Sequence, residues 1–174
     1  MPVRVPVREP FDLGSLPGRA VMTTCDEGIA RAEPRAVFDV VRDVLRWPER
    51  LAHYRFVRFR ESDGHGGGVV EMSANRPFGP FDWPTWWLSE MQVVPGRPAI
   101  RFRHIGGITT GMDVEWTFDP HVEGTRVRLL HVWNGPRWPL IGGFAAARVI
   151  GPVFIHGIAS RTLAGLSRAA EGTG

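Results

Sequence analysis

Residues Tyr54 to Trp133 alternate apolar and polar side chains, and this period of two constrains the fold more than any other feature of the sequence. Short segments rich in Gly, Pro, Asp and Asn separate the alternating runs. The runs are YRFVRFR, GVVEMSAN, TWWLSEMQVV, AIRFRHI, GMDVEWTF and TRVRLLHVW. Alternation bounded by turn residues is typical of strands with one buried face, so these runs predict six consecutive strands of an antiparallel meander.

Before the meander, the sequence predicts one strand and two short helices. Residues 19–31 are expected to form the strand, and EPRAVFDVVRDV then predicts a helix with Pro34 in its first turn. A proline disfavours helical geometry in the residue before it. Trp47 is therefore expected to end this helix, and Pro48 to begin a second one that runs to about Ala52.

After the meander, FAAARVIGPVFIHGIASRTLAGLSRAAEG predicts a helical segment that is kinked or restarted at Gly151-Pro152. One side of this segment collects apolar and small residues, namely Ile155, Ile158, Ala159, Thr162 and Leu166. The complete order is a strand, two short helices, six strands and a long helix.

Both ends of this pattern resemble a known superfamily. AEPRAVFDVVRDVLRWPERLAHYRFV resembles the first helices of the polyketide cyclase and START-related superfamily (SRPBCC), and GTRVRLLHVW with FIHGIASRTLAGLSRAAE resembles its last strand and C-terminal helix. The resemblance covers residues 19–170. It implies an α+β helix-grip fold, in which a curved antiparallel sheet of about seven strands wraps around a long C-terminal helix. The superfamily includes polyketide cyclases, coenzyme Q-binding proteins, lipid carriers and plant ligand-binding proteins, so the resemblance leaves the activity open.

A chain of 174 residues is expected to form one domain. Residues 1–17 carry four prolines and predict an extended or disordered arm, and residues 18–174 are expected to form the single helix-grip domain. There is no apolar signal-like segment at the N-terminus and no run of about 18 apolar residues, which favours a cytoplasmic protein without stable membrane insertion. Cys25 is the only cysteine and is expected to be a small buried strand residue.

The positive charge of the chain does not indicate a nucleic-acid partner. All 21 basic residues are Arg, as is typical of a GC-rich bacterial genome, and the formal net charge is only +3. No concentrated basic patch is visible in the sequence, so nucleic-acid binding is not expected.

Strand alternation places a defined set of side chains on the inner face of the sheet. In the register that keeps this face apolar, Met72 lies opposite Ser89, and Ser89 lies beside His104. Met112, Val114 and Trp116 join this face if the connection IGGITTG has an odd number of residues or a bulge, and the final strand then adds Trp133 to the row. The predicted ligand-binding residues are Met72, Trp87, Ser89, Met91, Phe102, Met112, Val114, Trp116, Leu129 and Trp133, with Ile155 and Ile158 from the terminal helix.

The outer face of the predicted sheet is charged. It collects Glu71, Glu90, Gln92, Arg101, Arg103, Asp113, Glu115, Arg126 and Arg128. Because opposite charges alternate across neighbouring strands, this face is expected to be solvated rather than to bind an anionic partner.

The three tryptophans of FDWPTWWLSEM are expected to have different roles. Trp87 points inward, Trp86 points outward or lies under a loop, and Trp83 precedes a proline in a loop, where it is expected to form an aromatic rim with Trp138. The inward rings either pack against the terminal helix as a core or line a cavity for a flat or chain-like apolar ligand.

A few polar residues on the inner face are candidates for chemistry. An imidazole can exchange a proton near neutral pH, and a guanidinium can hold an oxyanion. The predicted catalytic residues are His104, His131 and Arg55, with Tyr54, Arg76 and His156 as further candidates. His104 and His131 lie two strands apart, about 10 Å, which is too far for both to bind one Zn²⁺ ion, and no metal or other cofactor is expected.

Two functions from different classes fit these residues. In the first, the protein is a cyclase or dehydratase that promotes aldol ring closure of a polyketide-like chain, with an acyl carrier protein as a candidate partner. In the second, it is a carrier that binds a lipid, quinone or aromatic metabolite without changing it. The two inward histidines favour the enzyme, and the sequence leaves the ligand and the oligomeric state open.

Overall fold

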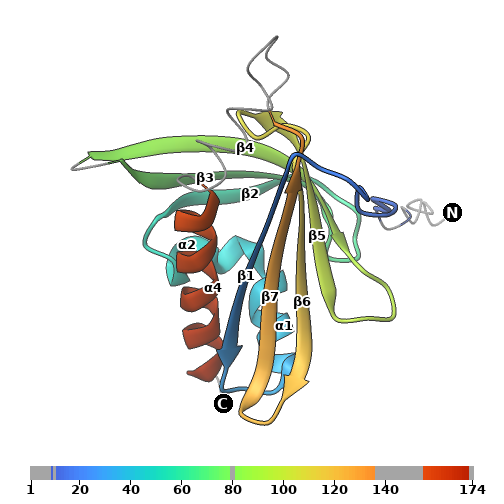
Figure 1. The fold of residues 1–174 in the computed structure, drawn as a ribbon, viewed down its shortest axis with the longest axis vertical. Helices are drawn as coiled ribbons and strands as arrows, with labels where there is room; N and C mark the ends of the chain where they lie inside the picture. The colour runs from blue at the N-terminus through green and yellow to red at the C-terminus, as the bar shows by residue number, and fades with distance from the viewer. Residues whose placement is uncertain (1–8, 10, 79–80, 136–154, 173–174) are drawn as a thin grey trace, which may run out of the picture.

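The structure is a computed structural model that describes residues 9, 11–78, 81–135 and 155–172; of residues 76–78, 81, 82 and 156 it describes the backbone alone. Seven antiparallel strands form one sheet in the order β1-β7-β6-β5-β4-β3-β2. The strands are β1 (Met22–Ala30), β2 (Tyr54–Ser62), β3 (Gly68–Phe78), β4 (Phe81–Val93), β5 (Ala99–Gly107), β6 (Asp113–His121) and β7 (Gly124–Trp133). Figure 1 shows the curved sheet wrapped around the long helix α4 (His156–Glu171), which confirms the predicted helix-grip fold.

Two short helices follow β1 as predicted, but their boundary differs from the expected one. Helix α1 (Pro34–Arg42) ends before Asp43, a 3₁₀ turn η1 covers Val44–Arg46, and Trp47 begins helix α2 (Trp47–Arg50) instead of ending α1. The φ and ψ angles of Asp43 are −80° and 65°, outside helical geometry. The proline after Trp47 is tolerated because a first-turn residue of a helix has no intrahelical partner for its N–H group.

The inner and outer faces of the sheet are assigned as predicted, although one register differs. Ser89 pairs with His104, as expected, whereas Met72 pairs with Trp87 and Val70 takes the place opposite Ser89. The pairing of β3 with β4 is therefore displaced by two residues from the prediction. An even displacement keeps every side chain on its face, so the predicted inward set is unchanged in orientation.

Helix α4 approaches the two short helices closely because a glycine faces them. A Cβ atom on Gly165 would lie 2.3 Å from Cδ2 of Leu51, a contact that would force Leu51 to move. The helix packs on the concave side of the sheet with its buried residues Ala159, Leu163 and Leu166. No helix within the described ranges is both long and apolar enough to cross a membrane.

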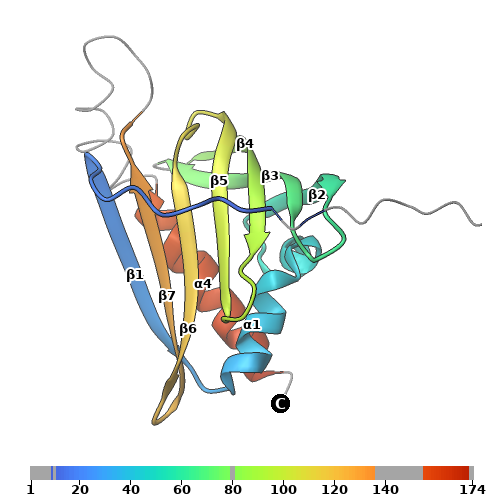
Figure 2. The same cartoon turned by 90° about the vertical axis from the view of Figure 1, so that its right-hand side faces the viewer.

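The outer face of the sheet is not simply solvated. Residues 11–14 run across it, and Leu13 is only 4% exposed. The N–H group of Leu13 donates to Oε1 of Gln92 (3.2 Å), while Arg103 and Arg101 donate to the carbonyl oxygens of Leu13 and Gly14. Figure 2 shows this segment crossing the strands on the side away from α4. The expectation of a solvated face is wrong here, because the strand side chains satisfy the backbone of the arm.

Part of the predicted arm is therefore ordered against the sheet. The remaining residues of segment 1–17 lie largely outside the described part of the chain. Cys25 also departs from its expectation, since its side chain is exposed. Met22, Asp26 and Ala30 are the buried residues of β1, and Cys25 has the opposite parity and falls on the outer side.

Candidate functional site

A cavity of about 70 Å³ lies between the concave face of the sheet and helix α4. Strands β2 to β7, α2 and α4 all contribute to its wall. The residues that line it are Trp47, Tyr54, Met72, Trp87, Phe102, His104, Met112, Val114, Trp116, Leu129, His131, Ile155, Ile158, Ala159 and Thr162. Most of this wall is apolar or aromatic, which is typical of sites for small apolar molecules.

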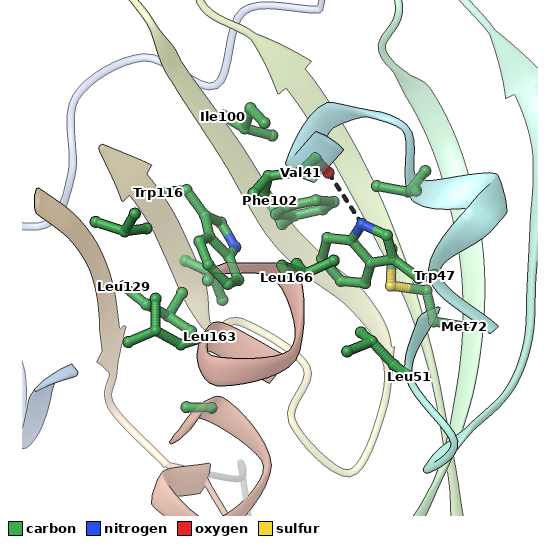
Figure 3. Packing of buried hydrophobic residues seen from close by; sticks show 14 of the residues in the cluster. Val41, Trp47, Leu51, Met72, Ile100, Phe102, Trp116, Leu129, Leu163 and Leu166 are labelled. Carbon is green, nitrogen blue, oxygen red and sulfur yellow. Dashed lines mark hydrogen bonds between the residues drawn. The ribbon is translucent and has the colours of Figure 1, made fainter. Parts of the chain in front are cut away.

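Trp47 is the centre of the aromatic wall. Its ring centroid lies 5.3 Å from that of Tyr54, 6.1 Å from Trp116 and 6.3 Å from Phe102. The indole Nε1 donates to the carbonyl oxygen of Val41 at 3.0 Å, so the polar atom of this buried ring has a partner (Figure 3). Helix α1 thus fixes the orientation of a ring that lines the cavity.

His104 presents a buried imidazole to this cavity from β5. Its ring stacks on Trp87, with centroids 6.1 Å apart and an angle of 17° between the planes. Its Nδ1 lies 2.7 Å from Oγ1 of Thr109, a residue of the connection between β5 and β6. The ring is therefore held on one face by an indole and on one edge by a hydroxyl.

His131 and Ser89 are the other polar groups near His104. His131 lies on β7, pairs with Val114 of β6, is buried and lines the cavity. Ser89 lies on β4 directly opposite His104 and is fully buried, and among the described residues its hydroxyl has no hydrogen-bond partner. A buried hydroxyl without a partner is destabilising, so Ser89 has unused hydrogen-bonding capacity on the inner face.

The opposite wall of the cavity is tied to the sheet by another histidine. Nε2 of His53, just before β2, lies 3.0 Å from Oγ1 of Thr162 on α4, and Thr162 lines the cavity. Burial lowers the pKa of His53, and the positive charge of Arg161 lowers it further. The neutral form of His53 is thereby favoured at neutral pH, in which it can accept or donate one hydrogen bond to the threonine.

The structure brings most of the predicted site residues together. Ser89, Met91 and Trp133 are buried on the inner face but do not line the cavity. Arg55 is exposed, hydrogen-bonds to the hydroxyl of Ser73 at 3.4 Å, and also lies outside the cavity wall. The remaining residues of the predicted set line the cavity, namely Met72, Trp87, Phe102, His104, Met112, Val114, Trp116, Leu129, His131, Ile155 and Ile158.

Several secondary candidates have other outcomes. Tyr54 lines the cavity, whereas Trp83 is 64% exposed and lies within β4 rather than in the predicted loop. Trp86 points outward as expected, is 43% exposed and donates from Nε1 to Oε1 of Glu71 at 2.6 Å. The side chains of Arg76 and His156, the whole of Trp138 and the expected kink at Gly151-Pro152 lie outside the described residues.

Sequence reasoning missed Trp47 and His53 as parts of the site. The segment RWPER was interpreted only as a boundary between helices, although a tryptophan at such a boundary is a signal of burial. No group of three or more His, Cys, Asp or Glu side chains suited to a metal ion occurs in the part of the chain that the structure describes.

The geometry can be compared with known families. Residues 31–150, which include both short helices and strands β2 to β7, match the model of the family described as polyketide cyclase / dehydrase and lipid transport. The chain belongs to this family. The description of this family covers both catalysis and lipid transport, so membership is compatible with an enzyme and with a carrier.

Several solved structures share the fold of this chain at low sequence identity. TTHA0849 from Thermus thermophilus is 20% identical, with a TM-score of 0.72 and coverage of 87% of this chain and 99% of that chain. The Zhui aromatase/cyclase from Streptomyces sp. R1128 is 19% identical, with a TM-score of 0.70 and coverage of 86% and 93%. A START superfamily protein from Mycobacterium smegmatis is 13% identical, with a TM-score of 0.59 and coverage of 87% and 94%. No curated protein sequence matches the chain significantly.

Proposed function

We propose that the protein binds a flat aromatic or polyketide-like molecule in the inner cavity and catalyses its aldol ring closure and dehydration. The observation that carries this proposal is the buried imidazole of His104 in an otherwise mainly apolar and aromatic wall. Desolvated polar groups inside such a wall interact strongly with a bound carbonyl compound because little water competes for them.

In the proposed reaction His104 exchanges the proton. The imidazole removes a proton from a carbon beside one carbonyl group, and the resulting enolate carbon forms a bond with the carbon of a second carbonyl group in the same chain. The imidazolium returns its proton to the new alkoxide, which becomes a hydroxyl group. In the dehydration the imidazole removes a proton from the adjacent carbon, a C=C double bond forms, and the hydroxyl group leaves with that proton as water. His131, on the next strand but one, supports the reaction as a donor to a carbonyl oxygen. Arg55 has no role in this scheme because its exposed side chain lies outside the cavity wall.

The size of the cavity adds a requirement to the proposal. At about 70 Å³ it has room for several water molecules, whereas pockets for small molecules usually measure about 300–1,000 Å³. A ligand with one or more rings must therefore displace side chains. Met72 and Met112 line the cavity, and the unbranched methionine side chain repacks at little cost.

A second candidate function is that of a carrier. It is favoured by the small polar share of the wall, in which the polar side chains are those of Tyr54, His104, His131 and Thr162. In a carrier these groups would hydrogen-bond to a carbonyl or hydroxyl group of the ligand. They would contribute to the binding affinity and to no reaction.

The two functions are separated by assaying wild type, His104→Gln and His131→Gln on a model poly-ketone thioester, of the kind that an acyl carrier protein would present. Loss of a general acid or base lowers a rate by about 10²- to 10⁴-fold, so ring closure should fall by that order in His104→Gln while ligand affinity stays within a few-fold. His121→Gln is the matched control, because His121 lies at the turn between β6 and β7 and does not line the cavity.

The carrier prevails if wild type binds the thioester and closes no ring above the spontaneous rate. In that case His104→Gln should change the affinity by roughly 0.5–1.5 kcal/mol, the contribution of one neutral hydrogen bond. Equal turnover in wild type and in both variants would keep the cyclase and remove these histidines from its mechanism.

A further inference from the structure

The connection between β5 and β6 places a buried hydroxyl against His104. Residues 108–112 connect the two strands, and within them Ile108 is exposed whereas Thr109 is only 2% exposed. Oγ1 of Thr109 lies 2.7 Å from Nδ1 of His104. The connection therefore turns its outer residues to solvent and one threonine toward the candidate site.

This connection is held in shape without the hydroxyl of Thr109. The N–H group of Gly111 donates to the carbonyl oxygen of His104 (2.7 Å), and the N–H group of Met112 donates to that of Thr109 (3.1 Å). Nε1 of Trp133 donates to the carbonyl oxygen of Thr110 at 3.0 Å. These bonds all use backbone acceptors, so removal of the Thr109 hydroxyl leaves the fold of the connection intact.

The imidazole is thus fixed in two directions. Trp87 covers one face of the ring, and Thr109 binds one nitrogen at its edge. A neutral imidazole carries its proton on only one of its two nitrogens. The hydrogen-bond partners of the two nitrogens decide which one is protonated. The hydroxyl oxygen of Thr109 can accept a hydrogen bond from Nδ1–H and so favour the tautomer that carries the proton on Nδ1.

We propose that Thr109 is a positioning residue that accepts a hydrogen bond from Nδ1–H of His104 and so assigns proton exchange with a ligand to Nε2. Nδ1 then keeps its proton throughout. Nε2 takes up a proton as the base and returns it as the acid, while the ring keeps its orientation. This inference rests on the proposed function, since it names the residue that prepares His104 for proton transfer.

The first test reads the imidazole directly and needs no substrate. The ¹⁵N chemical shifts of the His104 ring, measured on the full chain above the titration range of histidine, report which nitrogen carries the proton. Wild type and Thr109→Ser, which keeps the hydroxyl, should show the proton on Nδ1. Thr109→Val, which has nearly the same shape without a hydroxyl, should show a mixture of both tautomers. Thr110→Val is the matched control, because the hydroxyl of Thr110 donates to the carbonyl oxygen of Gly107 and not to His104. In this variant the tautomer of His104 should be the same as in wild type.

The second test is the rate of ring closure. Loss of a hydrogen-bond partner behind a functional histidine lowers activity by about 10- to 100-fold in comparable metal sites, so Thr109→Val should lower kcat by about 10-fold with KM within two-fold of wild type. Thr109→Ser should restore most of the rate, and Thr110→Val should be unaffected. The inference is overturned if His104 has the same tautomer in Thr109→Val as in wild type. It is also overturned if the proton of His104 lies on Nε2 in wild type. A change of tautomer in a protein without turnover overturns the proposed enzyme and leaves the positioning role of Thr109 in place.

Discussion

The two faces of the sheet stabilise the same strands by different means. On the outer face Glu71 is buried between Arg58 and Arg60, each 2.6 Å away, and accepts a further bond from the indole of Trp86. On the inner face Trp87, the next residue, stacks on His104 in the cavity wall. Two adjacent tryptophans of one strand therefore serve a charged network and a ligand site respectively. The cluster of indoles in the sequence is not one functional unit, because strand alternation separates its members.

The largest effect should come from the ring of helix α2 that packs against the inner face. Trp47→Ala removes a 3% exposed ring that contacts three other aromatic rings, and it leaves the carbonyl oxygen of Val41 without its indole partner. We expect a loss of about 3–5 kcal/mol in the free energy of unfolding, measured by urea denaturation.

The matched variant on the outer face is Trp86→Ala. Its ring is 43% exposed, and Glu71 retains Arg58 and Arg60 when the indole is lost. A loss of about 1 kcal/mol is expected. Equal losses at Trp47 and Trp86 would contradict the distinction between the aromatic packing against the inner face and the ion-paired outer face.

The segment across the outer face should have an intermediate effect. Leu13 is buried against the sheet, whereas Leu16, three residues along the same segment, is half-buried. Leu13→Ala is expected to lower the free energy of unfolding by about 2 kcal/mol, and Leu16→Ala by less than about 1 kcal/mol. Hydrogen exchange at the amide of Leu13, which donates to Gln92, should be protected in wild type and fast in Leu13→Ala.

A smaller effect should separate the two faces by pH. Burial, together with the charge of Arg161, lowers the pKa of His53 from 6.5, and hydrogen bonds, chiefly from Arg58, lower the pKa of Glu71 from 4.5 to about 2. In both cases the group binds its proton more tightly in the unfolded chain, so the free energy of unfolding decreases as the pH is lowered. The decrease is expected below about pH 6.5 for His53, and between about pH 4.5 and 2 for Glu71.

Two variants check these windows by urea denaturation at a series of pH values. His53→Gln should flatten the dependence between about pH 7 and 5 and leave the acid window unchanged. Glu71→Gln should flatten the acid window alone, and it removes the carboxylate to which Trp86 donates. If the pH dependence of both variants equals that of wild type, folding does not change the pKa of either group.

Strand periodicity predicted the parts of the fold and the site that depend on one-sided burial. The inward direction of Trp87 and the pairing of Ser89 with His104 both follow from keeping one face apolar. Periodicity does not determine the register of β3 with β4, because a displacement by two residues keeps each side chain on its face.

Features that depend on distant contacts could not be predicted in this way. Trp47 reaches the cavity because α2 packs against β2 and α4, and no local pattern encodes that contact. The ordering of residues 11–14 depends on Gln92, Arg101 and Arg103, which lie about eighty to ninety positions later in the chain. Thr109 lies in a connection whose sequence alone indicates only a turn.

The central claim, that the inner cavity binds a flat aromatic ligand, is tested most directly by NMR of ¹³C-methyl methionine in the full chain. Met72 and Met112 line the cavity, whereas Met22 is buried on β1 and does not, and it serves as the internal control. Titration with a hydroxyanthraquinone should shift the methyl signals of Met72 and Met112 saturably and with one Kd, through the ring current of the ligand and the repacking of both side chains, while Met22 stays unchanged. Signals of Met72 and Met112 that do not move up to the solubility limit, in a folded protein, would contradict the claim and show a packed core instead.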